Sequence, residues 1–78
     1  MKIHVFAVLK DYMPAVFELD VSAVKNISGV GELLKKQFPN AEALLNTCRY
    51  SSDTALLSIE DEITNYENIF VIPPSSGG

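Results

Sequence analysis

The sequence has very few of the residues from which small metal sites and disulfide-stabilised folds are built. It contains one cysteine, one histidine and no tryptophan in 78 residues. Because Cys48 has no partner, no internal disulfide can form, and the domain must be stabilised by packing. His4 has no companion His, Asp or Cys at ligand spacing, so the sequence predicts no metal site. We expect both to be ordinary strand residues.

Positive charge and long apolar runs are also scarce. Six residues are Lys or Arg and ten are Asp or Glu, which gives a net charge of −4. So few cations make a basic surface for nucleic-acid phosphates hard to build. No apolar run approaches the ~18 residues of a membrane span, and the N-terminus lacks the layout of a signal peptide. We therefore expect a cytoplasmic protein that binds neither nucleic acid nor membrane.

The composition that remains is that of one small globular domain. Hydrophobic residues make up 47% of the chain and charged residues 21%, which is typical of a folded rather than a disordered chain. A chain of this length has little scaffold for a cleft with a positioned set of catalytic groups. These observations favour a function that is carried out together with a larger partner.

The start of the chain predicts a β-hairpin. Residues 2–9 alternate with period two, and both faces of this strand are largely apolar. Such a strand suits the centre of a sheet, with one face in the core and the other lightly covered or bound by a partner. Residues 10–14 contain turn formers, and residues 15–21 alternate again.

A change of period then marks a helix. Its apolar stripe consists of Val30, Leu33, Leu34 and Phe38. Gly29 is the expected N-cap, and Pro39 ends the helix. Asn40 is expected to cap a short second segment over residues 41–45.

The rest of the chain predicts short strands over residues 47–51, 55–57 and 69–72. The last is strongly β-prone and is expected to be buried, so that Phe70→Asp would unfold the domain. The first and last strands are the most apolar and should pair in parallel at the centre of a mixed sheet. One main helix should pack on one face of that sheet. This α+β arrangement is the β-grasp, or ubiquitin-like, fold.

The segment Pro73-Pro74-Ser75-Ser76-Gly77-Gly78 predicts a tail that works inside another protein. The paired prolines stiffen the exit from the last strand, and four further residues span at most ~14 Å. Glycine has no Cβ, so the backbone can pass close to the walls of a partner's site. We therefore divide the chain into a domain over residues 1–74 and a flexible tail over residues 75–78. The alternative is a frayed terminus or a cloning remnant.

The terminal carboxylate of Gly78 suggests a specific chemistry. A carboxylate is a poor acyl donor, whereas an acyl-adenylate has a good leaving group that a sulfur nucleophile can displace. The product would be a thiocarboxylate at Gly78, which is a compact nucleophilic sulfur carried on a protein.

Four segments of the chain resemble the small subunit of molybdopterin synthase, the MoaD family of the MoaD/ThiS ubiquitin-like sulfur carriers. The segments are Phe6-Ala7-Val8-Leu9-Lys10, Gly29-Val30-Gly31-Glu32-Leu33-Leu34, Cys48-Arg49-Tyr50 and Pro73-Pro74-Ser75-Ser76-Gly77-Gly78. They are similar to that family's Phe-Ala-x-Leu-Arg/Lys, Thr-Val-Gly-Glu-Leu-Leu, Cys-Arg-Phe and Pro-Pro-x-x-Gly-Gly. The first three motifs are weak alone, and the last is fairly specific in a chain this short.

The resemblance implies a non-catalytic small subunit that donates sulfur within a molybdopterin synthase heterotetramer. An E1-like adenylating enzyme would use ATP to activate Gly78, and this chain would bind no cofactor itself. The tail would then insert into the large subunit, which is expected to hold the catalytic residues. There the sulfur would pass to cyclic pyranopterin monophosphate. The inserted residues would be Pro73, Pro74, Ser75, Ser76 and Gly77, followed by Gly78.

The resemblance also implies a docking surface. By position, Phe6, Leu56 and Ile72 correspond to an exposed apolar patch that contacts both partners, and the alternative is that they are ordinary core residues. Lys10 is expected to pair with a partner carboxylate or to remain a solvated turn residue.

Other functions remain open on the sequence alone. A sulfur carrier of the same fold could serve another pathway, such as synthesis of the thiamin thiazole or of a sulfur amino acid. A ubiquitin-like modifier would instead be conjugated to lysines through Gly78. The acidic run Glu60-Asp61-Glu62 is either a solvated loop or a negative surface that steers the domain to a basic partner.

Overall fold

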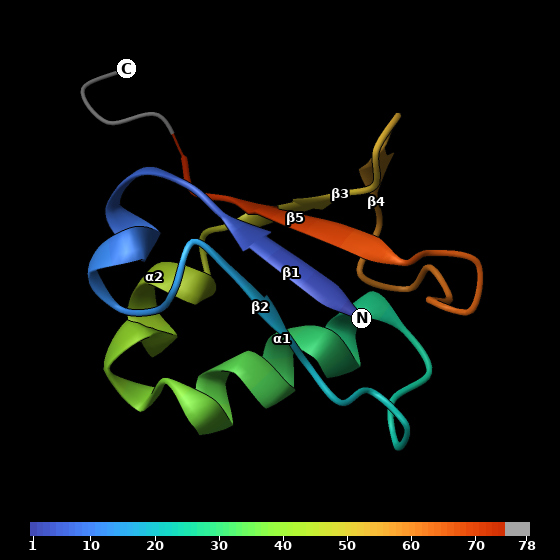
Figure 1. The fold of residues 1–78 in the computed structure, drawn as a ribbon, viewed down its shortest axis with the longest axis horizontal. Coiled ribbons are helices and arrows are strands. Elements are labelled where there is room, and N and C mark those ends of the chain that lie inside the picture. The colour runs from blue at the N-terminus through green and yellow to red at the C-terminus, as the bar shows by residue number, and fades with distance from the viewer. Residues whose placement is uncertain (75–78) are drawn as a thin grey trace.

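Two parallel strands occupy the centre of a five-stranded mixed sheet in the computed structural model, which describes residues 1–74 (Figure 1). The strands are β1 (Lys2–Val5), β2 (Val16–Glu18), β3 (Arg49–Ser51), β4 (Leu56–Leu57) and β5 (Asn68–Ile72). Their order across the sheet is β2-β1-β5-β3-β4. β1 and β5 are parallel, and the other neighbours are antiparallel. The prediction that the first and last strands pair in parallel at the centre is confirmed.

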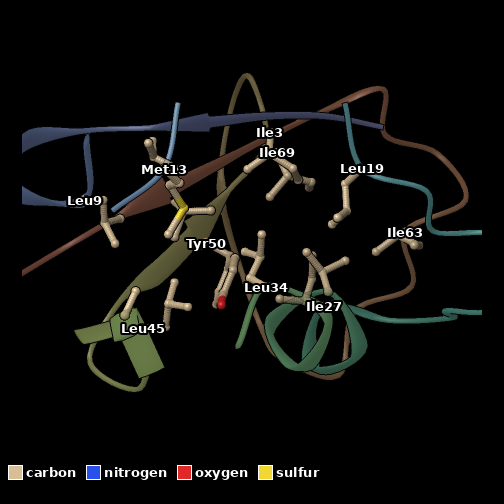
Figure 2. Close-up of a cluster of buried hydrophobic side chains, with 14 residues drawn as sticks. Ile3, Leu9, Met13, Leu19, Ile27, Leu34, Leu45, Tyr50, Ile63 and Ile69 are labelled. Carbon is tan, nitrogen blue, oxygen red and sulfur yellow. The ribbon is translucent and has the colours of Figure 1, made fainter. Parts of the chain in front are cut away.

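Helices cover one face of this sheet (Figure 1). They are α1 (Ile27–Gln37) and the single turn α2 (Glu42–Leu45), with the 3-10 turns η1 (Ala7–Asp11) and η2 (Pro39–Ala41). The core lies between the two layers, where Ile3, Ile69 and Val71 of the sheet are fully buried with Val30 and Leu34 of α1 (Figure 2). The predicted two-layer arrangement is therefore confirmed, and no helix of residues 1–74 lies on the opposite face of the sheet.

The first strand is shorter than predicted. β1 ends at Val5, and Ala7 adopts a φ of 53°, a left-handed conformation that costs a non-glycine residue about 1–2 kcal/mol. The chain then turns into η1, which places Leu9 in the core with no exposed surface. Burial of Leu9 from a turn, rather than from an extended strand, explains why the strand predicted over residues 2–9 is wrong beyond Val5. Residue 6 is left at the rim of the sheet.

Helix α1 begins earlier than predicted, and its N-cap is Asn26. The Asn26 side chain accepts a hydrogen bond of 3.0 Å from the backbone N–H of Gly29, so Gly29 lies inside the helix and is not its cap. Pro39 lies just past the end of α1, as predicted. Asn40, however, caps nothing: it lies within η2, and α2 has no side-chain cap.

The loop before Ile63 completes this helix start. The backbone carbonyl of Asp61 accepts from the N–H of Ile27 (3.0 Å), and that of Ile59 accepts from the N–H of Ser28 (2.8 Å). Together with the Asn26 side chain on Gly29, these two carbonyls satisfy the N–H groups of the first three helical residues, which have no acceptor within the helix. The acidic loop therefore has a structural role, because its backbone carbonyls cap the N-terminus of α1.

Replacing Asn26 with alanine should weaken this helix start. The substitution removes the side-chain acceptor for the Gly29 N–H, which should lower the free energy of unfolding by about 1 kcal/mol. Urea denaturation followed by circular dichroism measures the change, and Asn26→Asp is the matched control because it retains an acceptor. An equal loss of stability in both variants would contradict the capping role.

Tyr50 of β3 gives the fold a dependence on high pH. Burial, and after it the neighbouring groups of Cys48 and Glu32, raises the pKa of Tyr50 to about 12 from a usual value of 10.0. The unfolded chain therefore loses this proton first, so stability is complete below pH ~10 and falls by roughly 2–3 kcal/mol as the pH rises through 12. Urea denaturation at about pH 9 and about pH 11.5 should show this fall in the wild type. Tyr50→Phe should lack most of it, and an identical fall in that variant would contradict the assignment.

Candidate docking surface and tail

The face of the sheet that carries no helix presents a continuous row of side chains across all five strands. Strand register places His4 beside Val16 and Phe70, and it places Ser51 beside Phe70 and Leu56. Their neighbours in the chain, such as Ile3, Tyr50, Ile69 and Val71, point into the core. We call the row, with Phe6 and Ile72 beside it, the outer face.

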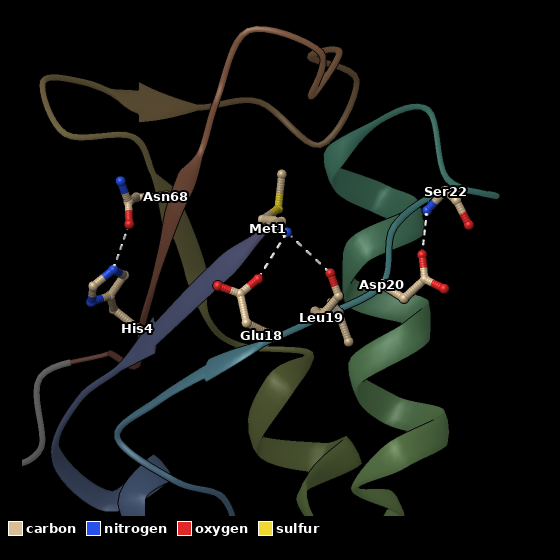
Figure 3. A network of polar contacts seen from close by, with 7 residues as sticks. All are labelled: Met1, His4, Glu18, Leu19, Asp20, Ser22 and Asn68. Carbon is tan, nitrogen blue, oxygen red and sulfur yellow. Dashed lines mark hydrogen bonds and ion pairs between the residues drawn. The ribbon is translucent and has the colours of Figure 1, made fainter.

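The centre of the outer face is an aromatic stack. The rings of His4 and Phe70 are 4.4 Å apart between centroids, at an interplanar angle of 19°. Phe6 extends the stack, with 6.1 Å between its centroid and that of Phe70. His4 is held in place by a hydrogen bond of 2.9 Å from Nε2 to the Asn68 Oδ1, which can only accept (Figure 3). The stack gives the outer face a preordered apolar centre.

The structure brings together two of the three predicted docking residues and links them to the third. Phe6 (42% exposed) directly follows β1, and Ile72 (37%) is the last residue of the parallel strand β5, so both lie at the same end of the sheet. Leu56 (61% exposed) lies on the edge strand β4, with Ser51 between it and Phe70. All three are thus exposed rather than core residues. Lys10 is exposed on η1.

The predicted burial of Phe70 in the core is wrong. Phe70 is half-buried on the outer face, whereas the fully buried residues of β5 are Ile69 and Val71. The strand alternation contained this information, because Ile72 was expected to face a partner and Phe70 lies two residues before it. The β-prone run was instead interpreted as buried on both faces. Val16, 49% exposed, is a further member of the surface that the sequence analysis did not assign to it.

The predicted tail starts at the edge of this surface. Pro73 is half-buried and Pro74 is exposed, directly after Ile72. Ser75, Ser76, Gly77 and Gly78 lie outside the described residues. Because β1 and β5 are parallel, Pro73 follows the sheet at the end where Phe6 and η1 also lie. A protein that covers Phe6 and Ile72 therefore also lies against the root of the tail.

The remaining candidate residues show no sign of catalytic activation. Cys48 is half-buried, its thiol donates to the carbonyl of Leu44 (3.3 Å), and burial raises the pKa of the thiol. Within residues 1–74, no three His, Cys, Asp or Glu side chains are grouped so as to hold a metal ion. No helix in the same part of the chain is long and apolar enough to cross a membrane.

A hollow lies at the other end of the sheet from Pro73. It has a volume of about 660 Å³ and is bordered by the first residues of β1 and β5 and by the loops that precede β5 and α1. Its lining includes Lys2, Glu18 and Glu67. Lys2 and Glu18 also lie at this end of the outer face, so it is the tail root, with Phe6 and Ile72, that lies away from the hollow.

A solved structure is similar to this chain over nearly its whole length. The crystal structure of SAMP1 from Haloferax volcanii matches this chain with a TM-score of 0.79 and 16% sequence identity, over 99% of this chain and 97% of that one. No protein-family model matches the sequence, and no curated protein matches it significantly. The chain has the β-grasp fold. The predicted fold class is thus confirmed, and the outer face is the uncovered side of a β-grasp sheet.

Proposed function

We propose that this β-grasp protein is a sulfur carrier that acts as the small subunit of molybdopterin synthase. In this role Gly78 is adenylated, converted to a thiocarboxylate and used to donate sulfur to the molybdenum cofactor precursor. The observation that supports the proposal best is the position of the exposed Phe6 and Ile72 and the half-buried Phe70 beside the root of a Pro-Pro-x-x-Gly-Gly segment. This arrangement favours a domain whose outer face is bound by a partner protein while its C-terminus reacts in that partner's active site.

The outer face supplies the binding energy in this proposal. Burial of apolar surface is worth roughly 25 cal/mol per Å², and a stack that is already ordered loses little side-chain entropy on docking. Phe6, Phe70 and Ile72 would contact first the E1-like adenylating enzyme and then the large subunit. Lys10 would lie at the rim of both interfaces, on η1.

The tail supplies the reacting group. Pro73 and Pro74 would direct it away from the sheet, and the slender residues Ser75, Ser76 and Gly77 would lead Gly78 into a narrow channel. The partner's ATP would convert the Gly78 carboxylate to an acyl-adenylate, and a sulfur nucleophile would then displace AMP. The chain itself would bind no cofactor, and the catalytic groups would belong to the partners.

A ubiquitin-like modifier is the second candidate. The similarity to SAMP1, a ubiquitin-like small archaeal modifier, favours it. The activated intermediate would be the same acyl-adenylate, but the final nucleophile would be a lysine amine in place of sulfur. A carrier for another sulfur-containing product would share the thiocarboxylate and differ in the enzyme that receives it.

Intact-mass spectrometry separates these functions. The full chain is incubated with the E1-like adenylating enzyme of the same organism, ATP and a sulfur donor. A sulfur carrier gains the mass difference between a sulfur and an oxygen atom, whereas a modifier forms isopeptide-linked adducts with other proteins. Co-purification with a molybdopterin synthase large subunit then distinguishes the molybdopterin pathway from other sulfur pathways. ATP-dependent adducts without any thiocarboxylate would contradict the carrier function.

A further inference from the structure

The outer face differs in charge from the rest of the molecule. Its outward-facing strand positions carry three charged residues, Lys2, Glu18 and Arg49. Two are positive and one is negative, whereas the whole chain has a net charge of −4. The acidic run from Glu60 to Glu62 lies on the helix side, where the backbone of its loop caps α1. The outer face therefore carries little of the negative charge of the chain.

The one acidic residue of the outer face is compensated within the chain. Glu18 lies opposite Lys2 in the β1–β2 register. Its Oε2 is also 3.4 Å from the N-terminal ammonium of Met1, which in turn donates to the carbonyl of Leu19 at 3.2 Å (Figure 3). These groups lie at the start of β1, away from the tail. Glu18 therefore contributes little field at the tail end of the surface.

Arg49 dominates the charge at the tail end of the outer face. It is exposed and lies opposite Ile72 in the β3–β5 register, one residue before Pro73. Lys10 and Asp11 are consecutive in η1, so their charges largely cancel at a distance. The ion pairs among residues 1–74 are Met1–Glu18 and Glu32–Lys35, so no carboxylate of that part of the chain pairs with the Arg49 guanidinium.

The tail does not provide the anion for Arg49 once it is inserted into a partner. Six residues from Pro73 to Gly78 span about 20 Å when extended, which puts the reacting carboxylate beyond the reach of the Arg49 side chain. A guanidinium is a planar fork that binds carboxylates with two parallel hydrogen bonds. An anion that binds Arg49 in the complex would therefore come from the partner.

We infer that the partner surface that receives the outer face is apolar at its centre and carries carboxylates beside the entrance of the tail channel, opposite Arg49. This inference rests on the proposed function, because it describes the adenylating enzyme that binds the same surface. It is the opposite of what the net charge suggests, since an acidic protein would be expected to meet a basic partner. The local field at the tail root, rather than the net charge, steers association.

Charge reversal tests the sign of this interaction. Binding of the full chain to the E1-like adenylating enzyme is measured by stopped-flow kinetics for the wild type, Arg49→Glu, Arg49→Gln and Lys36→Glu. Lys36 is exposed on the last turn of α1, in the helix layer, so Lys36→Glu makes the same change in net charge away from the docking surface. Circular dichroism and thermal unfolding establish that all four proteins are folded.

We expect Arg49→Glu to lower the association rate constant roughly five- to tenfold at low salt, and Arg49→Gln to lower it by less. The difference should shrink at about 0.5 M salt, and Lys36→Glu should change the rate constant less than twofold. An unchanged or faster association of Arg49→Glu would overturn the inference, and faster association would show that the partner surface is basic. If the wild type does not bind the adenylating enzyme at all, the proposed function fails and this inference fails with it.

Discussion

Replacing Ile69 with aspartate is expected to unfold the protein, whereas the same substitution at Phe70 is expected to leave it folded. Ile69 has no exposed surface and lies between β1 and β3 in the centre of the sheet. An unpaired carboxylate there should cost at least about 4 kcal/mol, a large part of the stability of a domain this small. Phe70 lies on the outer face, where an aspartate remains in contact with water. Thermal unfolding of both variants measures the difference.

The Phe70→Asp variant also tests the docking surface. Phe70→Asp removes the centre of the His4–Phe70–Phe6 stack and should weaken binding to the adenylating enzyme by at least about 2 kcal/mol, as is typical of a central aromatic anchor. Phe17→Leu is a suitable control, because Phe17 packs on the opposite face against Phe38. Unfolding of Phe70→Asp, or its normal binding, would show that the outer face is assigned incorrectly.

Deleting Gly78 is expected to abolish activation and to leave the melting temperature unchanged. Adenylation requires the terminal carboxylate to reach the partner's ATP, and removal of one residue withdraws it by about 3.5 Å, a displacement that a positioned reaction does not tolerate. ATP–pyrophosphate exchange catalysed by the adenylating enzyme measures the loss. We expect the rate to fall at least 100-fold.

Ser75→Ala is the control for this deletion, because it retains the length of the tail and its two terminal glycines. It should support exchange at close to the wild-type rate. Undiminished exchange by the deletion variant would show that Gly78 is not the activated residue. A large loss of thermal stability would show that the C-terminus belongs to the folded domain, contrary to the division of the chain proposed above.

Much of the fold could be predicted from the sequence, because the strongest patterns are long or unambiguous. The period-two alternation of Ile3 and Val5 and the β-prone run of residues 69–72 predicted the central parallel pair. The stripe with Val30 and Leu34 predicted the helix that covers it. Pro39 ends that helix in the structure as the sequence indicates. In each case, local preference and tertiary packing favour the same conformation.

The features that were predicted wrongly are those that tertiary contacts decide. Alternation alone extends the first strand to residue 9, but the core instead receives Leu9 from a turn that begins with Ala7 at positive φ. Gly29 was favoured as an N-cap because the apolar stripe was begun at Val30. The stripe in fact begins at Ile27, which is fully buried. A stripe that begins at Ile27 indicates the preceding residue, Asn26, as the N-cap.

The candidate site was predictable in part. The sequence left open whether Phe6, Leu56 and Ile72 form an exposed patch or belong to the core, and each of the three is exposed in the structure. Their connection through Phe70, His4 and Ser51 depends on strand register, which a single sequence does not determine. The position of Arg49 beside Ile72 depends on the same register, and for this reason only the structure reveals the local positive charge beside the tail.

The central claim is that the carboxylate of Gly78 is the reacting group and that the rest of the chain serves to deliver it. Tandem mass spectrometry of the protein after incubation with its adenylating enzyme, ATP and a sulfur donor tests this claim most directly. The account predicts that the sulfur-for-oxygen mass gain is found only in fragments that contain Gly78. Localisation of the added mass to Cys48 or to another internal residue, or the absence of any gain with an active enzyme, would contradict it.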